Sequence, residues 1–223
     1  MTYDEFATEV ASEYSLFLFA LSGAYLARVS PGRQVTPLLV KEFRADARRL
    51  SETFFDQLDR SVDSFMVTFG FGDTDSERET AFLNATHGMV AVNLAQINKQ
   101  MISGSVNFGN VLKNASGAIG LLVQKKLGMI DFKIPDAAGR MWNAETLFRM
   151  TARDFAYQTY IDEQVAELRA GGNKLAKVIY PDPTHKNHDG IISLDEEIDG
   201  YPTFASVRKV IFHPNANAEL THV

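Results

Sequence analysis

Apolar side chains recur every three or four residues over a long stretch that begins just after Thr36 and Pro37. Threonine caps helix N-termini and proline is favoured at the first helical position, so a helix should begin at Pro37. Charged residues such as Arg44, Arg48 and Glu52 fill the positions between the apolar ones. The spacing predicts a long amphipathic helix with its apolar positions at Leu39, Phe43, Ala47, Leu50, Phe54, Leu58, Val62 and Phe65.

The most apolar run of the chain, residues 14–27, precedes this helix. It is shorter than the ~20 residues that a membrane span requires, and acidic rather than basic residues come before it. We therefore expect no membrane span and no signal peptide, but a helix that is buried on most sides. The alternative is a helix that docks on a partner through Phe17, Phe19 and Tyr25.

A further helix should follow the first two. Ser76 and Glu79 have the spacing of a capping box, which predicts a helix from Ser76 to about Met101. Residues 111–123 are patterned more loosely and indicate a shorter helix.

In the last third of the chain the sequence pattern changes from long helices to one helix followed by short β-like runs. Asn143 is a good N-cap for a helix that reaches Leu168 and stops at Gly171-Gly172. Two short β-like runs follow, at 177–180 and 191–194, and residues 203–210 could form one small helix. The patterns together predict an α+β fold with a mainly helical domain over residues 1–135 and a small α+β domain over residues 136–223.

Amino-acid composition and net charge limit the classes of function that the chain can have. Of the 223 residues, 45% are apolar and 11% aromatic, which is enough for a packed core. The chain has no cysteine, which excludes disulfides and thiolate metal sites. Its net charge of −6 disfavours general nucleic-acid binding. Residues 98–149 carry seven basic and three acidic side chains, so a weak DNA contact by this segment stays open.

Side chains that can bind metal cluster at residues 185–190. An EF-hand calcium loop that starts at His185 fits at five of six positions, since calcium-loop residue types fall at Asn187, Asp189, Gly190, Ser193 and Glu196. The histidine is the mismatch, because the first position normally supplies a carboxylate oxygen. Prolines also occupy the places where an entering and an exiting helix should be. The simplest interpretation is an acidic turn between two strands.

Two transition-metal interpretations use the same loop. His185 and His188 have knuckle-like spacing, and His213 could complete a zinc site. A nuclease of the His-Asn-His type would use His188, Asn215 and His213. The alternative of a metal-dependent nuclease or hydrolase would use His185, His188, Asp189 and His213. Poor spacing for a closed tetrahedral site leads us to expect no bound cofactor, with calcium or zinc as the alternatives.

Several short motifs resemble, in order and spacing, the C-terminal region of phage minor capsid proteins of the Mu-type head-morphogenesis family. The resemblance covers residues 136–223. Its parts are Gly139-Arg-Met-Trp142 at a helix start, Met150-Thr-Ala-Arg153, the run 177–180, the knuckle at His185–His188, the run 190–194, Tyr201-Pro202 and His213-Pro-Asn-Ala216. The cysteines of the family are absent here, and Ala216 stands at the last cysteine position.

The resemblance implies a virion structural protein rather than an enzyme. Such proteins are present in few copies at the portal or inside the head, and they act in head assembly or DNA delivery. The expected location is the virion, and the host cytoplasm during assembly. The implied partners are a portal or major capsid protein, with self-association also open. The expected contact region contains Arg140, Trp142, Arg149 and Arg153.

Overall fold

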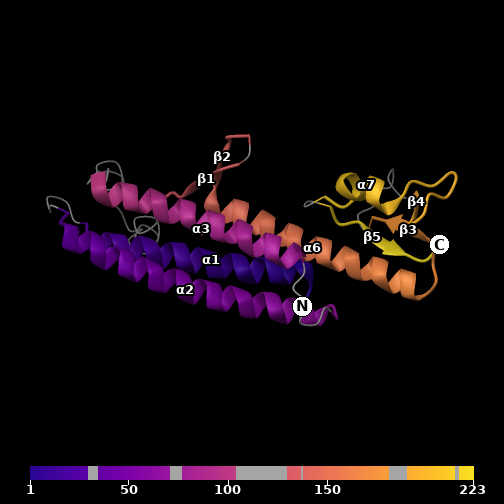
Figure 1. The fold of residues 1–223 in the computed structure, drawn as a ribbon, viewed down its shortest axis with the longest axis horizontal. Coiled ribbons are helices and arrows are strands. Elements are labelled where there is room, and N and C mark those ends of the chain that lie inside the picture. Colours follow the sequence, from indigo (N-terminus) through magenta and orange to yellow (C-terminus); the bar gives the residue numbers. More distant parts are fainter. Residues whose placement is uncertain (30–34, 71–76, 104–129, 137, 181–189, 214–215) are drawn as a thin grey trace, which may run out of the picture. The chain divides into compact units, whose positions relative to one another are not determined.

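The computed structural model describes residues 1–29, 35–70, 77–103, 130–136, 138–180, 190–213 and 216–223. Over these residues the chain forms four long helices, a short helix and two small antiparallel sheets (Figure 1). The predicted α+β class is confirmed. The helix predicted near residues 111–123 lies outside the described residues.

Helix α2 (Pro37–Thr68) begins where the sequence predicts. The Thr36 hydroxyl accepts a hydrogen bond from the Leu39 amide at 3.3 Å, which satisfies one of the free N–H groups of the first turn. From Phe43 to Phe65 the predicted apolar face is buried, except at Leu50, which is half-buried. Helices α1 (Tyr3–Leu26) and α3 (Glu77–Ser103) complete the N-terminal set.

Helix α6 (Ala144–Ala170) has both of its predicted end signals. The Asn143 side chain accepts from the Thr146 amide at 3.1 Å, so it is the N-cap. At the other end Gly172 adopts a φ of +78°, and the Asn173 amide returns to the Leu168 carbonyl at 3.0 Å. A positive φ is costly for any residue with a Cβ, which explains a glycine at this stop.

The two sheets are only partly as predicted. Strand β1 (Lys133–Pro135) pairs with β2 (Met141–Asn143), and neither strand was predicted. Trp142 therefore lies on β2, directly before α6, so its motif does precede a helix start as expected. Strand β3 (Leu175–Ile179) lies between β4 (Gly190–Ser193) and the unpredicted β5 (Glu219–Thr221), and the helix predicted at 203–210 is α7 (Phe204–Ile211).

The chain divides into two compact units that are discontinuous in sequence. The first unit contains Met1–Ala7, Val62–Phe82 and Met150–Val223, and the second contains Thr8–Ser61 and Leu83–Arg149. The predicted domain boundary at 135/136 differs from this division. It falls inside the second unit and would separate β1 from β2, which are paired strands.

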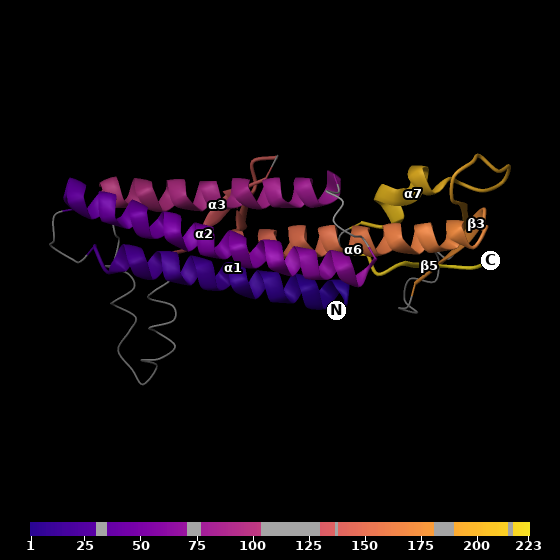
Figure 2. The same ribbon diagram turned by 60° about the horizontal axis from the view of Figure 1, so that its bottom comes forward.

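Aromatic rings form the core of the second unit. Tyr14 stacks on Phe148 with ring centroids 4.3 Å apart, and Phe17 stacks on Phe54 at 5.2 Å. These contacts join α1, α2 and α6 (Figure 2). The Tyr14 hydroxyl accepts a hydrogen bond from the Asn93 amide group, which adds α3 to the same cluster.

This packing corrects the docking surface predicted on α1. Phe17 is 5% exposed and Tyr25 is 1% exposed, so both belong to the core and cannot meet a partner. Only Phe19, at 47% exposure, lies on the surface, together with Leu16 one helical turn earlier. Among the described residues, no helix is both long enough and apolar enough to cross a membrane.

The core of the first unit has two parts. One is a second aromatic cluster, in which Phe82 stacks on Phe155 at 4.7 Å and Phe6 lies 4.5 Å from Phe65. The other joins the C-terminal end of α6 to β3, β4, β5 and α7 through buried residues such as Tyr157, Val178 and Phe212.

We predict that Phe54→Ala lowers the free energy of unfolding by about 3–5 kcal/mol, because it leaves a cavity among three neighbouring rings. Phe19→Ala should change it by less than about 1 kcal/mol, since that ring is half exposed. Denaturant titration of both variants would measure the difference. Equal losses would contradict this assignment of core and surface.

Candidate contact site

The turn between β1 and β2 is organised around one carboxylate, that of Asp136. Its Oδ1 accepts from the Ala138 and Arg140 amides, both at 2.9 Å. Its Oδ2 accepts from the Arg140 Nε at 2.7 Å and from the Trp142 indole N–H at 2.9 Å. Gly139 provides the positive φ of +77° that the turn requires. The motif Gly-Arg-x-Trp is thus held together by a residue that precedes it.

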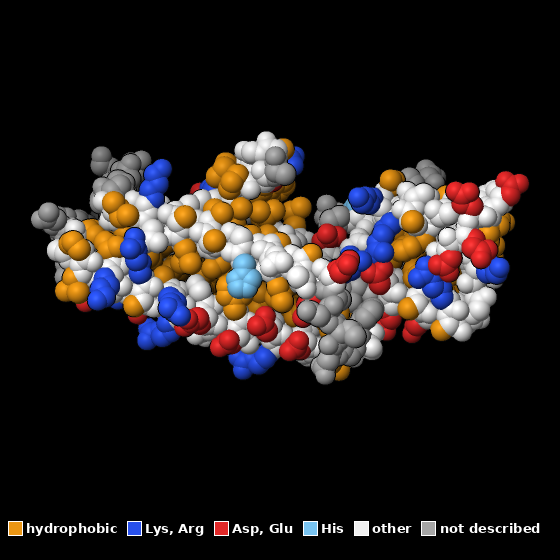
Figure 3. All heavy atoms as spheres, viewed as in Figure 1, with side chains coloured by type: hydrophobic (Ala, Val, Ile, Leu, Met, Phe, Trp, Pro, Cys, Tyr) orange, Lys and Arg blue, Asp and Glu red, His pale blue; other side chains and the backbone are white. Residues whose placement is uncertain are grey.

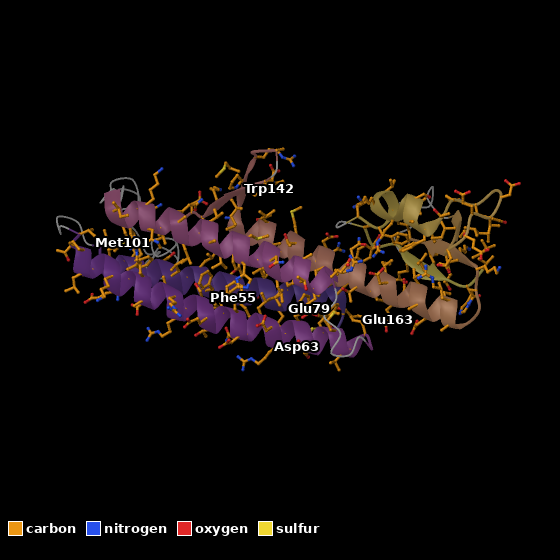
Figure 4. All side chains as sticks on the ribbon, in the orientation of Figure 1. Phe55, Asp63, Glu79, Met101, Trp142 and Glu163 are labelled. Atoms are coloured by element: carbon orange, nitrogen blue, oxygen red, sulfur yellow. The ribbon has the colours of Figure 1, made fainter. Side chains whose placement is uncertain are left out.

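These hydrogen bonds keep the Asp136 carboxyl group ionised. Hydrogen bonding from Trp142, and then from Arg140 and Ala138, lowers the pKa of Asp136 to about 2. The Arg140 guanidinium lies 5.7 Å from the centre of the Trp142 ring, within cation–π range. Arg140 and Met141 are exposed, at 72% for the arginine side chain and 58% for the methionine. The turn therefore presents a preordered cationic and apolar surface (Figure 4).

The other two predicted contact arginines behave differently from each other. Arg149 is exposed. Arg153 instead binds its own chain: its Nε donates to Asp4 at 2.8 Å, and both terminal nitrogens donate to the Ala216 carbonyl at 3.3 Å. It also lies over the rings of Tyr3 and Tyr157, at 5.4 and 5.8 Å. Arg153 is therefore an internal clamp of the first unit, and its assignment as a partner contact is wrong.

Most of the predicted metal loop lies outside the described residues, including His185, Asn187, His188, Asp189 and Asn215. His213 and Glu196 are described, and both are exposed. Glu196 lies 3.7 Å from the Lys174 ammonium. Residues 194–200 form bends, an isolated bridge and a turn, so the exiting helix of an EF-hand is not present there, as Pro202 led us to expect. The part of the chain that the structure describes contains no group of three or more metal-binding side chains.

A groove between α2 and α3 of the second unit was not predicted. It has a volume of about 480 Å³, and Figure 3 shows hydrophobic side chains along this seam. The Phe55 ring stacks on the imidazole of His87 with centroids 3.8 Å apart. The sequence did carry a signal, because Phe54 and Phe55 are adjacent and only one of two successive residues can enter the core of a helical bundle. The lining residues are Arg44, Ala47, Arg48, Ser51, Glu52, Phe55, Asp56, His87, Leu94 and Asn98.

A partly buried charge network in the first unit was also missed. Asp162 on α6 binds Arg78 at 2.5 Å and Arg208 at 2.6 Å, so it connects the start of α3 to α7. Arg208 donates in addition to the Gln158 amide oxygen at 3.0 Å. Burial raises the pKa of the neighbouring Asp154. The partners are more than forty positions apart in the chain, so no short sequence pattern predicts these contacts.

No family model, curated protein or solved structure matches the chain.

The depressed pKa of Asp136 predicts a local acid transition. The carboxylate stabilises the turn fully above its unfolded pKa near 3.8, and this stabilisation is lost as the pH falls through about 2. Trp142 is the single tryptophan, so its fluorescence reports the turn directly. We expect the fluorescence to change between about pH 4 and pH 2, and Asp136→Asn to show the acid-form signal at pH 7. A wild-type signal in Asp136→Asn at pH 7 would refute the assignment.

Replacing the clamp should loosen the first unit. We predict that Arg153→Ala lowers the free energy of unfolding by about 1–3 kcal/mol, because it removes an ion pair, two hydrogen bonds and two ring contacts. Hydrogen exchange should accelerate near Asp4 and at residues 216–221. Arg149→Ala is the control, with an expected change within about 0.5 kcal/mol. Similar effects of both substitutions would argue against the clamp.

Proposed function

We propose that the protein is a non-enzymatic structural component of a phage head, which acts at the portal vertex or inside the head through contacts with the portal or major capsid protein. Its working parts are surfaces rather than a reacting group. It would reside in the virion, after assembly in the host cytoplasm.

The observation that carries this proposal is the contact between motifs that the resemblance lists separately. Arg153, the arginine of Met-x-x-Arg, donates to the carbonyl of Ala216, the last residue of the His-Pro-Asn-Ala motif. The Ser193 amide, at the end of the 190–194 run, donates to the carbonyl of Pro202 in Tyr-Pro at 2.9 Å. These contacts support the proposal by making the separate motifs parts of one packed substructure of the first unit.

The turn at 136–142 supports a role in contacts. Its carboxylate, guanidinium and indole are already ordered, so a partner would lose little entropy on binding them. Arginine, methionine and tryptophan are also enriched in protein interfaces. The exposed pair Leu16 and Phe19 on α1 is a second apolar surface of the second unit.

The proposal predicts that the protein co-purifies with particles of the phage that encodes it. In R140Q/M141D, incorporation should fall at least about fivefold, because the exposed surface of the turn loses its charge and its apolar contact. The matched control is K209Q/V210D, an exposed Lys-Val pair on α7, which should be incorporated normally. Quantitative mass spectrometry of purified particles measures all three proteins, and circular dichroism checks that each is folded.

The two failures are distinguishable. Absence of the wild-type protein from particles would refute the proposed function. Normal incorporation of R140Q/M141D would refute only the contact site.

A further inference from the structure

The exposed face of α2 carries a line of charges with one reversal of sign. We call this line the α2 stripe. Its basic half contains Lys41, Arg44 and Arg48, and its acidic half contains Glu52, Asp56 and Asp59, with Ala45 and Phe55 among them. All of these side chains are exposed except Phe55, which is half-buried. At 3.6 residues per turn the eight positions fall on one side of the helix.

Electrostatics within the helix does not account for this order. The helix dipole favours acids near the N-terminus and bases near the C-terminus, the opposite arrangement. An ion pair inside the stripe joins Arg48 to Glu52 at 2.8 Å, in the less favourable direction for an i,i+4 pair. Such exposed pairs contribute little to stability. The order of charges therefore calls for an explanation outside the single chain.

We propose that the α2 stripe is a self-association surface, on which a second copy of this chain packs antiparallel about a twofold axis near Leu50. Residues equally distant from Leu50 then face each other. Arg48 faces Glu52 of the second copy, Arg44 faces Asp56, and Lys41 faces Asp59. Each pair occurs twice across the axis, so all six charged positions meet the opposite charge.

The sizes of the side chains that face each other also fit this twofold arrangement. Under this symmetry Phe55 faces Ala45 of the second copy, so a large ring meets a small side chain. The groove between α2 and α3 opens here, and Arg44, Arg48, Glu52 and Asp56 are among the residues that line it. Ala47, Phe55 and Leu94 contribute apolar walls to the groove. The second copy would cover these apolar atoms as the charges pair.

The length of the α2 stripe limits the surface that the proposed dimer can bury, and therefore its affinity. The stripe runs from Lys41 to Asp59, a rise of about 27 Å at 1.5 Å per residue. A single helix pair of this length buries less surface than a standard stable interface. The dimer should therefore be weak and reversible, and its dissociation constant should rise with salt, because charges at the rim are screened. This inference does not depend on the proposed role in a phage head.

Charge exchange tests the proposal directly. The full-length protein is examined by sedimentation equilibrium, at concentrations up to on the order of 1 mM, in low and high salt. We expect a monomer–dimer equilibrium that weakens with salt. R44E/R48E and E52K/D56K should each weaken the dimer at least about tenfold, since like charges then face each other. An equimolar mixture of the two variants should restore dimerisation as a heterodimer.

The matched control is R49E/R60E, which makes the same charge change at two exposed arginines of α2 beside the stripe. It should dimerise like the wild-type protein. Restoration in the mixture also excludes misfolding as the cause of weak association. A monomer at every concentration, open-ended oligomers, a dimer insensitive to R44E/R48E, or a mixture that stays monomeric would each overturn the proposal.

Discussion

One hydrogen bond joins two helices of the second unit inside its aromatic core. Tyr14 places a hydroxyl inside a cluster of phenyl rings, where an unpaired polar group would be costly. Asn93 is fully buried and supplies the donor. Burial also raises the pKa of Tyr14, so the hydroxyl stays neutral. The bond requires α1 and α3 to keep one rotation each, and the stacks of Tyr14 on Phe148 and of Phe17 on Phe54 follow from it.

In the first unit, side chains of α6 make hydrogen bonds with the backbone of the last segment of the chain. Its short strands offer few ladder hydrogen bonds of their own. Tyr157 therefore donates to the Ala218 carbonyl at 2.8 Å, and Gln164 accepts from the Leu220 amide at 3.0 Å. With Arg153 on Ala216, three residues of one helix hold the backbone of the last segment. The helix thus positions β5 as directly as its partner strand β3 does.

Local signals in the sequence predicted the local features of the structure. The predicted caps at Thr36 and Asn143 each bond the amide that the pattern indicates, because capping depends only on residues within one turn. Strands β1, β2 and β5 are three residues long, too short for an alternation of apolar and polar side chains to be read.

The errors at the candidate site have a common physical cause. Hydrophobicity placed Phe17, Phe19 and Tyr25 in one surface, but only packing against other helices decides which face of α1 is covered. Arg153 shows the same limit, since its partners Asp4 and Ala216 are distant in sequence. Trp142 and Arg140 do lie together on one ordered turn, and their role as partner contacts stays a prediction, whereas the carboxylate that orders them was not given a role.

The discontinuity of the first unit has a consequence for synthesis on the ribosome. Phe6 packs against Phe155 as well as Phe65, so the N-terminal segment cannot complete the burial of its ring until α6 has been made. At about 5–20 residues per second, that interval lasts on the order of ten seconds. During it the nascent chain exposes aromatic side chains that the finished protein hides. A chaperone that binds such segments during translation would therefore act on this chain before it could act on the folded protein.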